Sequence, residues 1–188
     1  MAPESIDQKL SFARSRLANL KALIDGNRLT NDPDARQHLT QEFFLHLVGA
    51  TEYLAQLVIE RRSLQLASEE VTVYKVAREL EKRDPSDPLL PWLKGLSADT
   101  RKTALPADPY SSEGLVYRTI NYRNEVAHRN TNPFHFVMSA GPKVAFFWLD
   151  PRDHARGHSD LPVDVDLSKM FSVVDERCRT VLAILALA

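Results

Sequence analysis

The sequence predicts a mostly α-helical fold, an up-and-down helical bundle with a β-hairpin inserted before the last helix. Apolar residues recur every three or four positions in several long segments, which is the spacing of one helix face. Capping residues, glycines and prolines stand at the ends of these segments. With 188 residues, the chain is expected to form a single domain over residues 1–188 around one hydrophobic core.

Two long helices are predicted in the N-terminal third. The first ends at Gly26-Asn27, and its apolar stripe consists of Ile6, Leu10, Ala13, Leu17, Leu20 and Ile24. The second begins at Asp32 and Pro33, an N-cap and a first-turn proline, and extends to about Arg62. Its apolar stripe consists of Leu39, Phe43, Leu47, Ala50, Leu54 and Leu57. A polar line of Glu42, His46, Gly49, Tyr53 and Gln56 on the same helix is expected to meet another polar seam, within the bundle or across a dimer.

A shorter helix and a proline-rich connector are predicted next. Segment 68–70, Ser-Glu-Glu, can cap a helix that ends near Asp84-Pro85, with Val71, Tyr74, Ala77 and Leu80 as its apolar residues. Segment 85–110 is rich in proline, so we expect an ordered excursion anchored by Trp92, with a short helix near residues 98–102.

The C-terminal third contains the last two predicted helices with the hairpin between them. Ser111 or Ser112 caps a helix that runs toward Asn130. Apolar alternation around a turn at residues 139–143 then indicates a hairpin over 134–149. After a polar loop, a last helix begins at Asp166 or Ser168. Its inward-facing residues are expected to be Met170, Phe171, Val174, Cys178, Val181 and Leu185.

Composition limits the classes of function. The 24 lysines and arginines against 25 aspartates and glutamates leave a net charge of −1, too little positive field to hold long nucleic acid without a local patch. The single cysteine, Cys178, excludes an intramolecular disulfide and a cysteine-based zinc site, which favours the cytoplasm. No segment has the length and apolarity of a membrane span or the pattern of a signal peptide, so no membrane association is expected.

The penultimate helix carries the residues that point most directly to chemistry. Asn124 and His128 are i,i+4 neighbours on one face, and Arg123 lies about 100° away with a side chain long enough to reach them. These three groups can bind one phosphate. A polar stripe of Tyr117, Asn121, Asn124 and His128 lies opposite Leu115, Thr119, Tyr122 and Val126. Alternatively, His128 and Arg129 satisfy the last carbonyls of the helix.

The segment from Tyr122 to His128 resembles the motif of the HEPN superfamily, in which an arginine is followed by a polar residue, a short gap and a histidine. The resemblance implies an α-helical bundle, commonly a dimer, in which Arg123 and His128 of two protomers converge in a cleft used for RNA. Active members of the superfamily are metal-independent endoribonucleases, many of them toxins of toxin–antitoxin or antiviral systems. The resemblance covers one helix closely and the rest of the chain loosely.

If the resemblance holds, the chain is an endoribonuclease that needs no metal or other cofactor. RNA supplies its own nucleophile, the 2′-hydroxyl, so His128 can act as general acid or base while Arg123 binds the phosphate and Asn124 orients it. Since each chain has one such histidine, a homodimer would supply both proton-transfer groups. Further substrate contacts are expected from Arg118, Asn121, Tyr117 and Arg129. RNA, a second copy and an antitoxin or other protein are the expected partners.

Several alternatives remain open at this stage. The chain can be a non-catalytic HEPN-like dimer or partner-binding module, or a small-molecule sensor with the Trp92 connector as a lid. The loop residues Asp150, Asp153, His154, His158 and Asp160 contain metal-ligand types, but a solvated turn explains their spacing better. Cys178 and Trp148 are interpreted as core residues, and His46 as a boundary residue.

Overall fold

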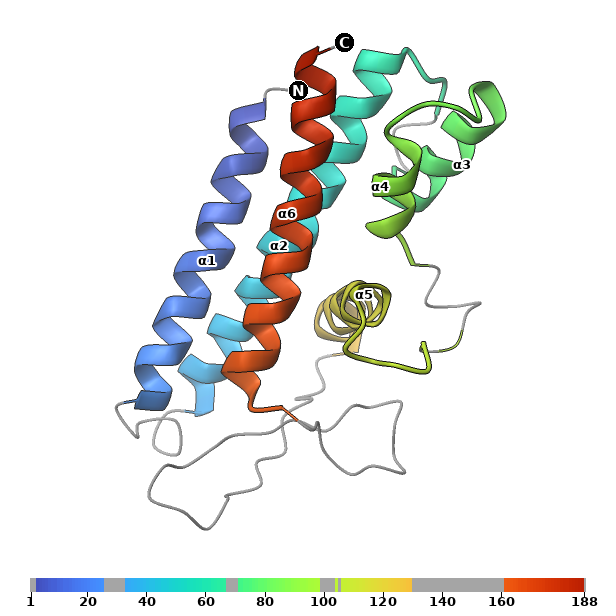
Figure 1. Cartoon of the computed structure of the whole chain (residues 1–188). Coiled ribbons are helices and arrows are strands. Elements are labelled where there is room, and N and C mark those ends of the chain that lie inside the picture. Colours follow the sequence, from blue (N-terminus) through green and yellow to red (C-terminus); the bar gives the residue numbers. More distant parts are fainter. Residues whose placement is uncertain are drawn as a thin grey trace.

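Six α-helices make up most of the chain that the computed structural model describes, namely residues 3–25, 33–66, 71–98, 104, 106–129 and 161–187. Helices α1 (Pro3–Asp25), α2 (Pro33–Arg62) and α6 (Val163–Leu187) lie side by side along the length of the molecule (Figure 1). Helix α5 (Ser112–Arg129) crosses them and is seen end-on in the same view. The prediction of a mostly helical bundle is therefore confirmed, although α5 departs from a simple up-and-down arrangement.

The two N-terminal helices begin and end close to their predicted bounds. Their apolar stripes are buried against each other, with Leu10, Phe43 and Leu54 almost fully enclosed. Helix α2 is also packed against α5 and α6, so its buried surface is wider than one stripe. Phe44 and Val58, which lie outside the predicted stripe, are buried as well. A helix covered on several sides buries residues all around its axis, which makes α2 the central element of the core.

Helix α3 (Val73–Arg83) begins later than segment 68–70 suggested. Thr72 is its N-cap, and the hydroxyl oxygen of Thr72 accepts a hydrogen bond of 3.3 Å from the backbone N–H of Lys75. Residues 67–70 lie outside the described part of the chain. Tyr74 was expected to face the core but is 41% exposed. Ala77 and Leu80 are buried as predicted, Val71 is only partly buried, and Val73 and Val76 complete the buried face.

Helix α4 (Leu90–Gly95) provides the order expected of the proline-rich connector. This short helix forms around Trp92; of residues 98–102, where a short helix was predicted, 99–102 lie outside the described part of the chain. Leucines carry most of its packing, since Leu89, Leu90, Leu93 and Leu96 are buried while Trp92 is only partly buried. The leucines therefore anchor the connector on the core, and Trp92 contributes less to this packing than predicted.

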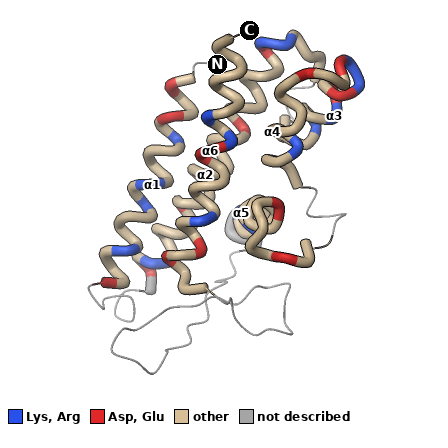
Figure 2. Tube along the Cα trace, in the orientation of Figure 1, with Lys and Arg blue, Asp and Glu red and all other residues tan. Residues whose placement is uncertain are grey.

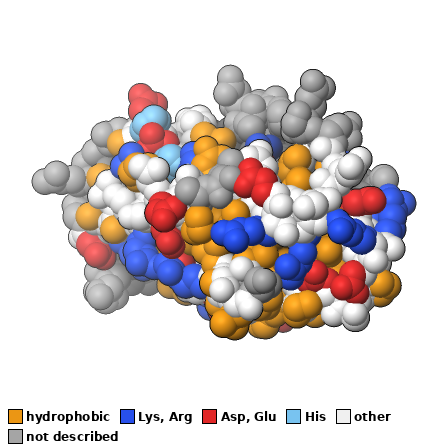
Figure 3. Space-filling view, turned by 90° about the horizontal axis from the view of Figure 1, so that it is seen from above, with side chains coloured by type: hydrophobic (Ala, Val, Ile, Leu, Met, Phe, Trp, Pro, Cys, Tyr) orange, Lys and Arg blue, Asp and Glu red, His pale blue; other side chains and the backbone are white. Residues whose placement is uncertain are grey.

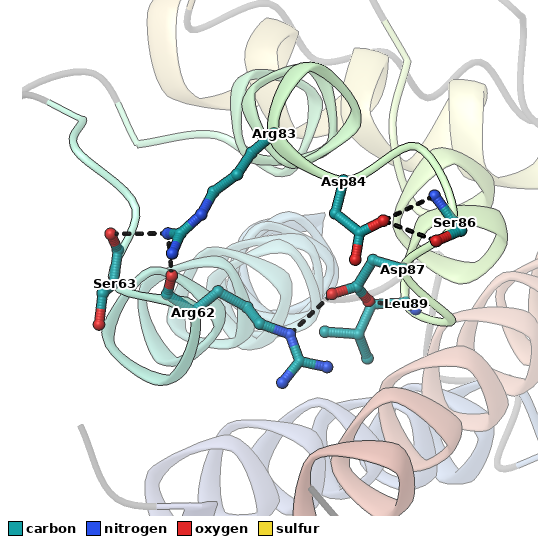
Figure 4. Close-up of polar contacts among 7 residues, drawn as sticks. All are labelled: Arg62, Ser63, Arg83, Asp84, Ser86, Asp87 and Leu89. Carbon is teal, nitrogen blue, oxygen red and sulfur yellow. Dashed lines mark hydrogen bonds and ion pairs between the residues drawn. The ribbon is translucent and has the colours of Figure 1, made fainter.

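A polar junction joins the ends of α2 and α3 to the start of α4 (Figure 4). Asp87 accepts hydrogen bonds of 2.8 Å from the backbone N–H of Leu89 and from the Nε–H of Arg62. Arg83 donates to the carbonyl of Ser63 over 3.1 Å, and it also donates to the carbonyl of Arg62 at the end of α2. These bonds satisfy terminal backbone groups of two helices.

The last two helices begin with defined local contacts. The hydroxyl of Ser111 accepts a hydrogen bond of 3.0 Å from the N–H of Gly114, which confirms one of the two predicted caps of α5. Helix α6 begins at Val163, directly after Pro162 and earlier than Asp166 or Ser168. The six apolar residues expected to face inward from α6 are all buried. The predicted hairpin over 134–149 lies outside the described residues, and no strand occurs among the residues that are described.

Candidate functional site

Arg123 lies on α5 where this helix crosses α2. Its Nη2 is 2.9 Å from Oε1 of Glu52 on α2, and its Nη1 donates a hydrogen bond of 3.3 Å to Oδ1 of Asn124. The side chain of Arg123 is 28% exposed and that of Glu52 is 39% exposed. The motif arginine is thus oriented by two neighbours while part of its surface stays open to solvent.

The crossing of α5 over α2 explains this placement. Tyr122 is buried, and its ring packs against Phe44 of α2 with 5.5 Å between the centroids. Successive residues of a helix are rotated by about 100°, so Arg123 emerges at the edge of this contact when Tyr122 points inward. Glu52 lies about two turns beyond Phe44 on α2, within reach of a long arginine side chain.

The backbone of α5 continues as a helix through His128 to Arg129. Asn124 and His128 are therefore separated by one helical turn, as the sequence predicted. The side chains of residues 125–129 lie outside the described part of the structure. The structure accordingly describes two of the three motif side chains, Arg123 and Asn124, and it brings these two into contact.

Residues 114–119 of α5 are buried, together with Asn121 and Tyr122, although Tyr117 and Asn121 belong to the predicted polar stripe. Tyr117, Arg118 and Asn121 were expected to contact substrate, but each of them is only 3% exposed. The reason is that α5 is packed against both α2 and α6, so that opposite faces of its first turns are covered. The assignment of these three residues to substrate binding is corrected: they are part of the interior. The side chain of Arg129 lies outside the described residues.

Arg118 has an internal partner, Asp166 of α6. Nη1 of Arg118 donates to Oδ1 of Asp166 over 3.0 Å, and Nη2 of Arg118 pairs with the other carboxylate oxygen. The guanidinium also lies over the ring of Tyr110, 5.2 Å from its centroid. Burial opposes the charged form, but Tyr122 and Asp166 hold the pKa of Arg118 above its ordinary value. Arg118 therefore fastens α5 to α6.

Two residues that pair with the arginines of α5, Glu52 and Asp166, were not predicted as partners from the sequence. Asp166 falls on the buried stripe of α6 with Val163 and Met170, and this spacing alone could have marked it as an internal charge. Glu52 has no comparable signal, because one glutamate on a half-exposed helix is ordinary. Only the crossing of α2 and α5 distinguishes it from the other glutamates.

The polar line of α2 faces α1 and not α5. The rings of His46 and Phe12 are 5.2 Å apart, Lys9 lies over the ring of Tyr53 at 5.5 Å, and Arg16 pairs with Glu42. Burial and the nearby Lys9 lower the pKa of His46, which disfavours its protonation. The polar line of α2 thus meets a second set of side chains within the bundle, but these belong to α1 and include an aromatic residue.

Other candidate sites lie away from the motif or outside the described residues. A cavity of about 420 Å³ at the end of the bundle that holds both termini is lined by Pro3, Asp7, Leu57, Arg61, Arg179, Leu182, Ala183, Leu185 and Ala186. Trp92 does not line it, so this cavity gives no support to a sensor with a Trp92 lid. Among the described residues, no group of three or more histidines, cysteines or acidic residues could hold a metal ion. The candidate loop at 150–160 is not among them.

Charges of both signs are mixed over the described helices. Basic and acidic positions both occur along each of α1, α2 and α6 (Figure 2). Figure 3, which looks down on the end that holds the termini, shows basic, acidic and hydrophobic side chains next to one another. No helix in the described part of the chain is long and apolar enough to cross a membrane.

No protein-family model, curated protein or solved structure matches this chain. The resemblance to the HEPN superfamily is therefore based on the sequence motif at residues 122–128.

Proposed function

We propose that this chain is a HEPN-like, metal-independent endoribonuclease in which Arg123 binds the scissile phosphate and His128 transfers a proton. The observation that carries the proposal is the position of Arg123. It is partly exposed, oriented by Asn124 and Glu52, and located on a helix that continues without interruption to His128. The two arginines of α5 whose side chains the structure describes differ sharply, since Arg118 is enclosed in the core while Arg123 is partly exposed.

The reaction needs few groups because RNA contains its own nucleophile. A base removes the proton of the 2′-hydroxyl, an acid protonates the leaving 5′-oxygen, and a cation stabilises the charge on the phosphorus centre. An imidazole with a pKa near ~6.5 can serve as either acid or base at neutral pH. One such histidine per chain favours a homodimer in which two copies of His128 share the two proton transfers.

The pairing of Arg123 with Glu52 is compatible with phosphate binding. An ion pair between partly exposed side chains contributes about 0–1 kcal/mol, so an incoming phosphate can displace the carboxylate. Arginine can then donate two parallel hydrogen bonds to the phosphate oxygens. With a net charge of −1 on the chain, the site would grip only a few phosphates, which suits a restricted set of RNA substrates.

The biological setting proposed for this activity is that of a cytoplasmic toxin or antiviral defence component. A ribonuclease of this kind requires control, and an antitoxin or other protein that covers Arg123 would provide it. The buried, unpaired thiol of Cys178 agrees with a reducing compartment.

The test is an RNA cleavage assay without metal. Purified wild type, His128→Ala and Arg123→Ala are incubated with total RNA in EDTA, and circular dichroism checks that each variant is folded. We expect fragments with wild type and a loss of roughly 10²–10⁴ in rate for His128→Ala. Intact RNA with the wild type, or equal cleavage by all three proteins, would show that the chain is not a nuclease of this class.

A second function, a non-catalytic partner-binding module, is favoured by one specific observation. Both terminal nitrogens of Arg123 already have protein partners, Glu52 and Asn124, so the arginine can serve as an internal fastener. In that case Arg123→Ala lowers the thermal stability and leaves RNA untouched. A loss of cleavage at an unchanged melting temperature supports the nuclease instead.

A further inference from the structure

The guanidinium of Arg123 is occupied on both of its terminal nitrogens. Nη2 is bound by the carboxylate of Glu52, and Nη1 by the amide oxygen of Asn124. These are donors that a bidentate phosphate contact would use. Asn124 is neutral and its contact is long, at 3.3 Å, whereas Glu52 carries a full negative charge at 2.9 Å. Glu52 is therefore the main competitor for an anion at this position.

We infer that Glu52 is a positioning residue. Its carboxylate holds Arg123 in the unliganded protein, and a phosphate must replace this carboxylate on the guanidinium when substrate binds. The carboxylate keeps the guanidinium ordered at the crossing of α2 and α5, and it lowers the affinity of the site for anions. Glu52 thus regulates the proposed nuclease site, and in this respect its role rests on the proposed function. Exchange between the carboxylate and a phosphate depends only on the contacts of Arg123.

A comparison within α5 shows why this pair can exchange. Arg118 and Asp166 form a two-pronged pair in which the side chains are 3% and 0% exposed, so opening it would leave charges in the core. Arg123 and Glu52 form a single contact, with side chains 28% and 39% exposed. Water can solvate both groups as they separate, so opening this ion pair costs little free energy. The same helix therefore carries one permanent ion pair and one that can open.

The charge of Glu52 acts in two ways against a bound phosphate. It must first release Arg123, and afterwards its carboxylate remains close to the negatively charged ligand. Glu52→Gln removes the charge and keeps nearly the same side-chain volume. We expect this variant to bind phosphate groups roughly 3–10-fold more tightly at low ionic strength, with a smaller gain as salt increases.

The first experiment uses inorganic phosphate as the probe. Thermal unfolding of wild type, Glu52→Gln, Arg123→Ala and the double variant is measured over a phosphate series, with chloride at matched ionic strength as the reference. Glu60→Gln is the matched control, since it removes the same charge from an exposed position of the same helix, about two turns away. Stabilisation by phosphate should be greatest for Glu52→Gln and should disappear when Arg123 is also replaced.

The second experiment uses a fluorescent 2′-O-methyl RNA oligonucleotide, which lacks the nucleophile and cannot be cleaved. Fluorescence anisotropy should show tighter binding by Glu52→Gln, by the factor given above. Glu60→Gln should stay within about twofold of wild type, because eight residues of helix, about 12 Å, separate Glu60 from Glu52, and this exceeds the Debye length of about 8 Å at physiological salt. The double variant with Arg123→Ala should show no gain.

The outcomes separate the role of Glu52 from the function of the protein. If Glu52→Gln binds phosphate no better than Glu60→Gln, or gains affinity without Arg123, the exchange does not occur and the inference is overturned. If phosphate behaves as expected but total RNA stays intact with wild type, the exchange stands and the nuclease proposal fails. If RNA is cleaved while Glu52→Gln binds more weakly than wild type, Glu52 assists binding and the inference is wrong.

Discussion

Replacement of Asp166 by asparagine should strongly destabilise the fold. Arg118 would keep its charge, since its pKa lies above the ordinary value, but it would lose its carboxylate partner. The two side chains are 3% and 0% exposed, so water cannot compensate for the missing charge. Breaking a buried ion pair by removal of one partner costs about 3–5 kcal/mol. This is a large part of the total stability of a domain.

The assay is urea and thermal unfolding followed by circular dichroism. For a domain of this size, 1 kcal/mol corresponds to about 2–4 °C in the melting temperature, so Asp166→Asn should melt roughly 6–20 °C below wild type. The exposed pair of Lys82 and Glu79 is the control. Glu79→Gln should change the free energy of unfolding by less than about 0.5 kcal/mol.

A double replacement tests the cause of the effect. Arg118→Met with Asp166→Leu removes both charges and fills the space with apolar atoms. Such exchanges are often neutral or stabilising, so the double variant should recover most of the stability that Asp166→Asn loses. If Asp166→Asn costs less than about 1 kcal/mol, the pair is not an internal fastener. The assignment of Arg118 to the interior would then be wrong.

Three further predictions follow from local geometry. Gly114→Ala should lower the free energy of unfolding, measured by denaturant titration, by about 1–3 kcal/mol, because a Cβ there would lie 2.4 Å from the carbonyl oxygen of Asp108. Gly49→Ala is the control: a Cβ there meets only the Lys9 side chain, at 3.7 Å, so this variant should be neutral or stabilising. Burial raises the pKa of Cys178 to about 12, so its thiol should react with Ellman's reagent at pH 8 only after unfolding. The stability that the buried neutral thiol contributes should be lost as the pH rises from 9 toward 12. Rapid labelling of the native protein would contradict this assignment. Burial and Lys9 lower the pKa of His46, so the stability contributed by its neutral form is present above about pH 6.5 and is lost as the pH falls through the lower pKa of the folded state. His46→Gln should therefore make the melting temperature depend less on pH between pH 7 and 5. An unchanged slope would refute the assignment.

The helices themselves could be predicted because their signals are local. The spacing of Leu10, Leu17 and Leu20 or of Val174, Cys178 and Val181 shows which face is buried whatever the partner is. Caps and prolines placed most ends within a few residues. At α3 the predicted cap came a few residues too early and Tyr74 was placed on the buried face; Thr72 is the cap, and Val73 and Val76 are buried beside the predicted Ala77 and Leu80.

The motif was predictable as a set of residues on one helix, but its surroundings were not. Sequence spacing placed Tyr117 and Asn121 on a polar stripe with Asn124 and His128, and Arg118 was predicted as a further substrate contact. Tyr117, Arg118 and Asn121 all lie in one part of α5. It is buried because α5 crosses the long helices and is covered by two of them. A periodic pattern records which residues share a face and does not record how many neighbours cover that face.

By itself, then, the chain determined where helices form, which side of each is apolar, and that Arg123, Asn124 and His128 share a short stretch of one helix. Only the tertiary structure decided that Arg118 is enclosed while Arg123 is partly exposed. Asp166 and Glu52 lie 48 and 71 positions from their arginine partners, so no local rule connects them. The pairing follows from how α2, α5 and α6 cross, and helix crossing depends on the packing of whole surfaces and not on neighbours in sequence.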